Sequence, residues 1–399
     1  MLLFCAYKGA YPKGQAMANR LQCYAKALVA SDITFTVASE GQRSSSPGKM
    51  EIFEGHTVWH WCKPYFLDRI PVFNLFFSGI ARWKLYAHLF RNREIDVILS
   101  AGYRWPQMIL FALIARLSGK KYVIELNEVP HSIIVGRFQM KATNRLKRWI
   151  TLHFAFPLID GFIVISNNLY SLTLKHANQK AKTIKIPILT DSVVPKNDYT
   201  LKKVVTIFHA GTLTIEKDGI VAVFEGVAKA ITQSGMNIQF VLSNYQTLPG
   251  IKSQIEAIID EYGIREHITF HKYLSKEDLE DHYRNASLAI INKPDNYRNR
   301  YNFSTKLGEC MSYGLPIIAT PVGESGNYLK DGENCLLLNS SEDADELAAK
   351  ILRIVQDPEL AQRLGEGAKN TADRYFHYSN YGTVFRAFLE DLSVGSIDR

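Results

Sequence analysis

Short apolar runs recur along the whole chain, and segments with apolar residues at helical spacing separate them. The runs are four to six residues long and rich in Val, Ile, Leu and Phe, which is typical of strands buried on both faces. Strands that alternate with helices favour an α/β fold with parallel, doubly wound sheets. The predicted strands are residues 2–6, 33–38, 97–100, 122–126 and 162–166 in the first half, and residues 204–208, 238–242, 288–292, 316–319 and 335–338 in the second.

The length of the chain and one polar segment predict two domains. A chain of 399 residues can form two ordinary hydrophobic cores, and the polar segment from Asp191 to Lys203 is the best linker candidate. We therefore expect a Rossmann-like domain over residues 1–195, a second one over residues 203–377, and a separate C-terminal helix within residues 378–399. Ligands of such domains bind at the carboxyl ends of the strands.

Composition is that of a globular protein, with 47% hydrophobic and 22% charged residues. No apolar run approaches the roughly 20 residues that span a bilayer, and the first residues predict a core strand in place of a leader peptide. The five cysteines are scattered without metal-type pairing, which favours reduced core thiols in a cytoplasmic protein. They are Cys5, Cys23, Cys62, Cys310 and Cys335.

Positive charge is concentrated in the first half of the chain. Residues 1–200 hold 26 Lys and Arg against 12 Asp and Glu, whereas residues 201–399 hold 21 against 27. Two acid-free, aromatic-rich segments, from Arg69 to Arg93 and from Arg137 to Ile150, carry five basic residues each. An anionic membrane surface or a nucleic acid would suit them, and core helices with basic solvent faces are the simpler alternative. The chain has no recognised nucleic-acid motif, so we favour the membrane.

One stretch carries the clearest candidate chemistry, YNFSTKLGECMSYGLPIIATP at residues 301–321. It predicts a loop, a helix that begins near Ser304 and Thr305, and a buried strand. Free amides at the helix start attract anions, and Glu309 follows about one turn later. A diphosphate on amides beside a carboxylate that grips a ribose diol would form a nucleotide site. An ordinary capped helix followed by a core strand is the alternative.

This stretch resembles the donor-site signature of the group 1 retaining glycosyltransferases, which have the GT-B fold of two Rossmann-like domains facing a cleft. Glu309 matches the second glutamate of that signature, which in the family holds the nucleotide ribose. Phe303 matches the aromatic residue of the turn, and Met311, Gly314 and Pro316 match the tail. The resemblance implies that the last helix crosses back onto the N-terminal domain.

The stretch also departs from the family pattern. Tyr301 stands where the family has its first glutamate, which touches the transferred sugar, and Ser304 replaces a glycine. Lys306 occupies a position where a branch of the family also has lysine. Donor binding is therefore better supported than the identity of the sugar.

Two glycine-containing loops add candidate donor contacts. Gly9 and Gly14 follow the first predicted strand, where a plain turn is an equally good interpretation. The resemblance places such a loop against the donor phosphates. In the second domain Gly211 and Lys217 match the family's glycine turn and phosphate-binding lysine. Thr212 or Leu213 stands where many members have arginine.

The end of the fourth predicted strand supplies the other candidates. Many family members have a histidine or aspartate there, close to the sugar, and Asn127 and Glu128 are its counterparts. Glu128 could accept the proton of an acceptor hydroxyl. His131 fits a loop histidine better.

The pair Asp343 and Asp345 forms an Asp-x-Asp pattern, but it precedes a helix, and we interpret it as capping. Capping is also the simpler role for Ser166. No cluster has metal-ligand spacing, and the resemblance implies neither a metal nor a cofactor.

The resemblance implies a retaining, metal-independent glycosyltransferase that takes its sugar from a UDP- or GDP-linked donor. The acceptor would be a glycan or a lipid-linked hydroxyl in cell-surface polysaccharide biosynthesis, and the enzyme would lie peripherally on the cytoplasmic face of the plasma membrane. A GT-B sugar-nucleotide isomerase such as a 2-epimerase and a non-catalytic sugar-nucleotide-binding subunit remain alternatives. The nucleotide base, the sugar, the acceptor and the linkage cannot be inferred from the sequence.

Overall fold

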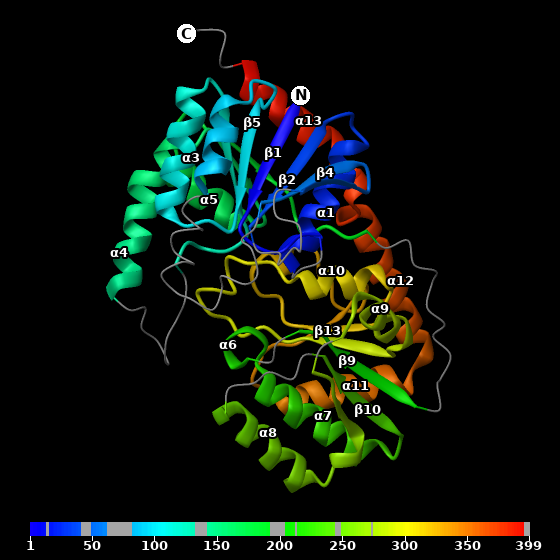
Figure 1. The fold of residues 1–399 in the computed structure, drawn as a ribbon. Coiled ribbons are helices and arrows are strands. Elements are labelled where there is room, and N and C mark those ends of the chain that lie inside the picture. Colours follow the sequence, from blue (N-terminus) through cyan, green and yellow to red (C-terminus); the bar gives the residue numbers. More distant parts are fainter. Residues whose placement is uncertain are drawn as a thin grey trace. The chain divides into compact units, whose positions relative to one another are not determined.

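The computed structural model describes residues 1–12, 16–40, 49–61, 82–131, 142–191, 204–211, 214–243, 249–272 and 274–394 (Figure 1). The chain forms two compact units, Met1–Leu189 with Tyr378–Arg399, and Thr190–His377. Each unit is an α/β domain around its own sheet, so the predicted fold class is confirmed. In the described ranges no helix has the length and apolarity needed to cross a membrane.

Unit 1 contains an eight-stranded sheet in the order β3-β4-β2-β1-β5-β6-β7-β8. Every pair is parallel except β3 with β4, which form an antiparallel hairpin at one edge. The hairpin was not predicted, because its exposed edge strand lacks an apolar run. The strands are β1 (Leu2–Tyr7), β2 (Thr34–Ser39), β3 (Lys49–Phe53), β4 (His56–His60), β5 (Val97–Ala101), β6 (Lys121–Leu126), β7 (Gly161–Val164) and β8 (Lys182–Lys185).

The helices of unit 1 cover this sheet. The C-terminal helix α13 packs on α1 and β8, and the rings of Tyr24 and Phe385 meet edge to face at 4.9 Å. Segments from opposite ends of the sequence thus share one core. The described helices are α1 (Ala16–Val29), α3 (Trp105–Leu117), α4 (Ala142–Ile150), η2 (Thr151–Ala155), η3 (Phe156–Leu158), α5 (Asn167–His176), η6 (Tyr378–Tyr381) and α13 (Gly382–Val394).

Unit 2 contains a six-stranded sheet in the order β11-β10-β9-β12-β13-β14, all of whose pairs are parallel. Numbered within the unit this is 3-2-1-4-5-6, the order of a doubly wound dinucleotide-binding sheet. The chain reverses its direction of winding between β9 and β12. The strands are β9 (Val205–His209), β10 (Ile238–Leu242), β11 (Ile268–Phe270), β12 (Leu288–Ile291), β13 (Ile317–Ala319) and β14 (Leu336–Leu337).

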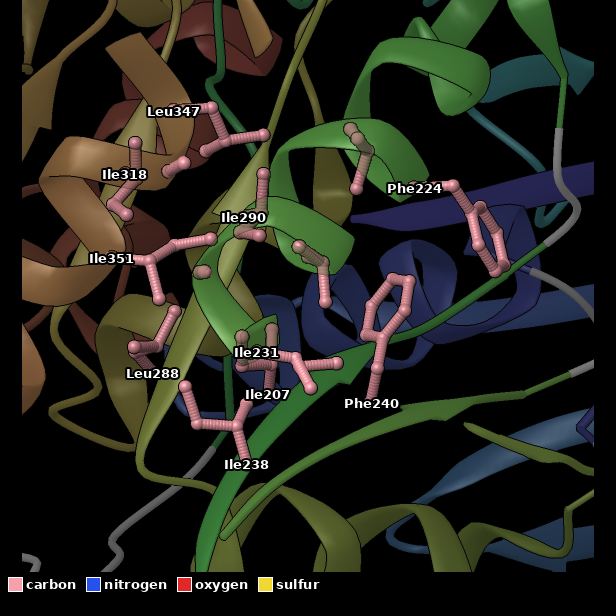
Figure 2. Close-up of a cluster of buried hydrophobic side chains, with 14 of the residues drawn as sticks. Ile207, Phe224, Ile231, Ile238, Phe240, Leu288, Ile290, Ile318, Leu347 and Ile351 are labelled. Atoms are coloured by element: carbon pink, nitrogen blue, oxygen red, sulfur yellow. The ribbon is translucent and has the colours of Figure 1, made fainter. Parts of the chain in front are cut away.

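The core of unit 2 lies between this sheet and its helices. Figure 2 shows Phe224 and Ile231 of α7 and Leu347 and Ile351 of α11 around strand residues such as Ile290. The helices are α6 (Ile215–Asp218), α7 (Ile220–Ser234), α8 (Pro249–Tyr262), η4 (Arg265–His267), α9 (Lys276–Asn285), α10 (Thr305–Ser312), η5 (Gly323–Asn327), α11 (Ala344–Gln356) and α12 (Pro358–Tyr375).

Several predictions about individual elements can be compared with the structure. All ten predicted strands overlap observed strands, with ends that differ by a few residues. Helix α12 was not predicted, although Asp357 caps it and Pro358 occupies its first position, where proline is tolerated. The four cysteines among the described residues are free and buried, as expected for core thiols; Cys62 lies outside the described residues.

Candidate functional site

The carboxyl ends of β9 and β12 are adjacent in unit 2, and this is the point where the strand order reverses. Doubly wound sheets bind their ligands at such a point, because the loops on either side diverge there and leave a crevice. His209 is the last residue of β9, and Lys293 comes directly after Asn292 at the end of β12. These residues define the candidate site of unit 2.

A buried ionic network lies at this point. The ammonium of Lys306 donates to Asp218 Oδ1 at 2.6 Å and lies 3.3 Å from His209 Nε2. Burial, and then the charge of Lys306, lowers the pKa of His209 to about 3, so the imidazole is neutral at physiological pH. Burial alone would disfavour the carboxylate of Asp218, but Lys306 and its other cationic neighbours hold the pKa of Asp218 below its usual value. Lys306 is therefore positioned from two sides.

The glycine turn after β9 lies against this lysine. Gly211 has φ +95°, a left-handed conformation that favours glycine, and a Cβ atom built there would lie 3.8 Å from Lys306 Nζ. The amide of Gly211 donates to Ser243 Oγ at 2.8 Å. That amide is thus engaged within the protein, so we assign Gly211 a role in shaping the turn. Its neighbour Thr212 lies outside the described residues.

Helix α10 begins where the sequence predicts. Ser304 is its N-cap and makes no side-chain capping bond, so the side chain does not occupy the first-turn amides. Glu309 lies one turn inside, and the buried hydroxyl of Tyr283 donates to its Oε2 at 2.8 Å. Burial raises the pKa of Glu309, while the bond from Tyr283 and the charge of Lys306 oppose that shift.

The short helix α6 places Lys217. Thr214 caps it by accepting from the Lys217 amide at 3.1 Å, and the carboxamides of Asn296 and Asn299 both donate to the carbonyl of Glu216. The loop after β12 therefore fastens the segment that carries Lys217 and Asp218. None of these asparagine contacts was predicted, because each joins positions about 80 residues apart in sequence.

The same loop contains buried polar atoms that lack hydrogen-bond partners within the described part of the chain. They are the side-chain oxygens of Asn292, Asn299 and Asn302. Buried acceptors without partners are unfavourable, and they are found where a ligand or water completes the site. All three asparagines follow β12 in the sequence, and no local pattern predicted them.

Phe303 and Tyr301, two predicted donor-site residues, lie in different environments. The Phe303 side chain is buried and stacks on Tyr328 at a centroid distance of 5.2 Å, with Phe376 edge-on to it. We assign it to packing, in contrast to the predicted contact with the donor. Tyr301 is partly exposed in a turn, with its ring 5.1 Å from that of Tyr297.

In unit 1 the reversal of strand order falls between β1 and β5, and Gly9 follows β1. A Cβ at Gly9 would collide with the ring of Tyr7, so packing within the turn already requires glycine there. Gly14 lies outside the described residues. Asn127 and Glu128 follow β6; Asn127 Nδ2 lies 3.6 Å from the sulfur of Met17, and Glu128 is exposed.

Glu125, at the end of the same strand, has a structural role. Its carboxylate accepts from Arg20 Nε at 2.6 Å and from the Tyr24 hydroxyl at 2.8 Å, and all three side chains are buried. The pair joins β6 to α1, and Arg20 also donates to the carbonyls of Ile186 and Pro187. Glu125 is therefore fully occupied by the fold.

The capping assignments are confirmed. Asp343 is the N-cap of α11 and accepts from the Glu346 amide at 2.8 Å, while Asp345 pairs with Lys229. Ser166 caps α5 by accepting from the Leu169 amide at 3.3 Å. Within the described residues no group of three or more His, Cys, Asp or Glu side chains is arranged to hold a metal ion.

Solved structures define the class of the fold. Sucrose-phosphate synthase from Thermosynechococcus elongatus matches 99% of this chain and 100% of its own with a TM-score of 0.73 at 16% identity. Anabaena Alr3699/HepE in complex with UDP and glucose matches 98% of this chain and 99% of its own with a TM-score of 0.66 at 16% identity. The chain has the GT-B fold of these proteins.

The second comparison concerns unit 2. Residues 201–371 match the model of the family of glycosyl transferases group 1. A curated relative, alpha-D-kanosaminyltransferase from Streptomyces kanamyceticus, is 24% identical over 162 residues, which are 41% of this chain and 39% of the relative. The chain thus matches well under half the length of that relative.

Proposed function

We propose that the protein is a retaining, metal-independent glycosyltransferase that moves a sugar from a UDP- or GDP-linked donor to a hydroxyl group. Unit 2 would bind the donor and unit 1 the acceptor. The observation that carries the proposal is the ionic network of Lys306, which lies at the strand-order reversal of unit 2. The uncapped start of α10 and the carboxylate of Glu309 belong to the same helix as Lys306. UDP in the complex of Anabaena HepE supports a nucleotide ligand for this fold.

The residues have distinct proposed roles. Lys217 and Lys306, together with the first amides of α10 at Ser304 and Thr305, would stabilise the leaving diphosphate, where negative charge accumulates in the transition state. Glu309 would accept from the ribose hydroxyls. The acceptor would attack from the face that the diphosphate leaves, with that phosphate assisting.

In unit 1, Glu128 and Asn127 would make the polar contacts to the sugar or the acceptor, and the glycine turn at Gly9 would lie near them. Glu128 is exposed and follows a strand that neighbours the reversal point of the unit 1 sheet, which supports its being accessible to a ligand.

Incubation of the protein with radiolabelled sugar nucleotides and a membrane extract tests the proposal. We expect transfer of the label to an extractable lipid or glycan. Isomerisation of the sugar nucleotide would identify the 2-epimerase alternative. Binding without turnover would identify a regulatory subunit, and Tyr301 in place of the first motif glutamate would then explain the lack of catalysis. A saturation-transfer screen across UDP-, GDP- and ADP-sugars identifies the base.

Lys217→Ala is expected to lower the transfer rate far more than the stability. A point charge on a phosphate contributes in the transition state, whereas α6 is held by Thr214 and by two asparagines that do not involve the Lys217 side chain. Initial rates at saturating donor and the thermal unfolding midpoint are the two measurements. A sharp fall in the midpoint with unchanged turnover would show that Lys217 is structural.

We also propose that unit 1 binds the anionic cytoplasmic face of the plasma membrane, where lipid-linked and polysaccharide glycans are assembled. Helix α4 contributes no buried side chain, and it carries Arg145, Lys147 and Arg148. Leu146 is 58% and Trp149 is 51% exposed, and Phe154 of η2 lies 5.4 Å from the Trp149 ring. Exposed apolar side chains among basic ones suit an anionic lipid interface. Of the remaining parts of the two basic segments, residues 69–81 and 137–141 lie outside the described residues. Residues 82–93 are described, and Arg82 there pairs with Glu40 at 2.8 Å.

Replacing Arg145, Lys147 and Arg148 with glutamine is expected to release the protein from anionic vesicles. Each basic residue near such a surface contributes about 1 kcal/mol, screened over about 8–10 Å at physiological salt. Flotation with phosphatidylserine-containing and neutral vesicles at low and high salt measures this. A matched variant with Arg265, Arg284 and Lys330 of unit 2 changed to glutamine should still float. Equal flotation with both vesicle types would contradict the proposal.

A further inference from the structure

Lys293 is a buried lysine that belongs to no motif. It comes two residues after the end of β12, and only 6% of it is exposed. Its backbone is fixed on both sides by one threonine, since its amide donates to Thr320 Oγ1 at 2.7 Å and its carbonyl accepts from the same hydroxyl at 2.9 Å. The position of this lysine is thus set by the neighbouring strands β12 and β13.

The charge around Lys293 is unbalanced. Its ammonium makes no hydrogen bond or ion pair within the described ranges, and the charged groups that face it are Asp218, Lys306, Lys217 and Arg298. The carboxylate of Asp218 is already bonded to Lys306 at 2.6 Å. Asp218 is therefore shared between Lys306 and Lys293, and His209 is neutral. Buried charges are normally paired, and among the described residues Lys293 has no carboxylate of its own.

We propose that Lys293 binds the diphosphate of the nucleotide sugar, as a donor-site residue additional to Lys217 and Lys306. The inference rests on the proposed function and adds a residue to the same site. Three observations converge on it: the location at the strand-order reversal, the unpaired ammonium facing both motif lysines, and the partnerless oxygens of Asn292 and Asn299 in the same loop. A diphosphate supplies the missing negative charge.

A consequence is that donor binding depends on pH in a range where lysines usually do not titrate. Burial lowers the pKa of Lys293 to about 8; Lys306, Lys217 and Arg298 add to this shift, and Asp218 opposes it. An anion binds the protonated form more tightly, so donor affinity should fall as the pH rises through this value. At pH 8.5 binding should take up protons, because the bound diphosphate raises the pKa of Lys293.

The test compares wild type with Lys293→Met by calorimetry, using UDP-glucose and GDP-mannose. We expect Lys293→Met to weaken binding of the sugar nucleotide about 10-fold to 100-fold at pH 7, the usual effect of losing a charge-assisted hydrogen bond. Affinity for the nucleoside alone should be unchanged. The wild-type affinity should fall from pH 7 to pH 9 more steeply than that of the variant, and proton uptake at pH 8.5 should be absent from the variant.

Methionine is close to lysine in size and removes a buried unpaired charge, so the thermal unfolding midpoint of Lys293→Met should not fall. Lys330→Met, at an exposed lysine of unit 2, is the control and should bind as wild type does. Equal affinity of wild type and Lys293→Met, or a weaker affinity with an unchanged pH profile and proton uptake, would overturn the inference. Failure of the wild type to bind any UDP-, GDP- or ADP-sugar would overturn the proposed function itself.

Discussion

Glu309→Ala is expected to weaken binding of the sugar nucleotide by about 1.5–3 kcal/mol, and transfer with it, while the fold persists. Glu309 lies one turn inside α10, where a nucleotide over the helix start would place its ribose within reach of the carboxylate. Losing a charge-assisted hydrogen bond has an effect of this size, which corresponds to about tenfold or more in Kd. Calorimetry with the sugar nucleotide that wild type binds measures it.

Two matched variants separate the ribose contact from support of the helix. Glu309→Gln can still accept from the buried Tyr283 hydroxyl and loses only the charge. Tyr283→Phe keeps the carboxylate and loses only that bond. We expect Glu309→Gln to lose part of the affinity without a change in thermal unfolding, and Tyr283→Phe to keep most of it. Unchanged nucleotide affinity in Glu309→Ala would refute the assignment.

Arg20→Met is expected to destabilise unit 1 by about 3–5 kcal/mol, because it leaves the carboxylate of Glu125 buried without a cation. The side chains of Arg20 and Glu125 are only 3% and 0% exposed. Without Arg20 the pKa of Glu125 in the folded protein should lie well above its unfolded value. The loss of stability is therefore complete above that raised pKa, and it should shrink as the pH falls from there toward the unfolded pKa of the carboxyl group.

Urea unfolding followed by tryptophan fluorescence reports on unit 1 selectively, since all five tryptophans lie in it. The double variant Arg20→Met with Glu125→Gln should recover much of the lost stability, because glutamine is neutral and can accept from Tyr24. Lys182→Met, which removes the exposed pair with Asp391, should change stability by less than about 1 kcal/mol. If Arg20→Met lowered the free energy of unfolding as little as Lys182→Met does, the buried pair of Arg20 and Glu125 would not be what holds α1 on the sheet.

The fold could be predicted because its main signals are local. Parallel strands buried on both faces, such as β1 and β9, appear as continuous apolar runs, and helices appear between them. The hairpin β3-β4 and helix α12 were missed for opposite reasons. The exposed β3 lacks an apolar run, whereas α12 carries its apolar residues at wide spacing among many polar ones.

The candidate site was predicted only where a motif marks it. Glu309, Ser304 and Lys306 were predicted from their order in the sequence, and helix α10 starts where the sequence places it. Asp218, His209, Lys293 and Tyr283 were not found, since nothing in their immediate sequence distinguishes them from solvated or core residues. Glu125 illustrates the opposite case, a charged residue near a strand end that has a structural role. The local sequence cannot distinguish a carboxylate that binds a ligand from one that binds a buried arginine, as Glu125 does.

The sequence by itself determined the class of fold, the separation into a basic and an acidic half, the course of most strands, and the helix that carries Glu309. These depend on the spacing of apolar residues and on helix-start chemistry, both of which act over a few neighbouring positions. The tertiary structure alone decided which charges are paired and which are not. Lys306 meets Asp218 across 88 positions and Arg20 meets Glu125 across 105, whereas Lys293 faces an Asp218 that Lys306 already holds. Such partners are brought together by sheet order, which the local pattern of residues does not contain.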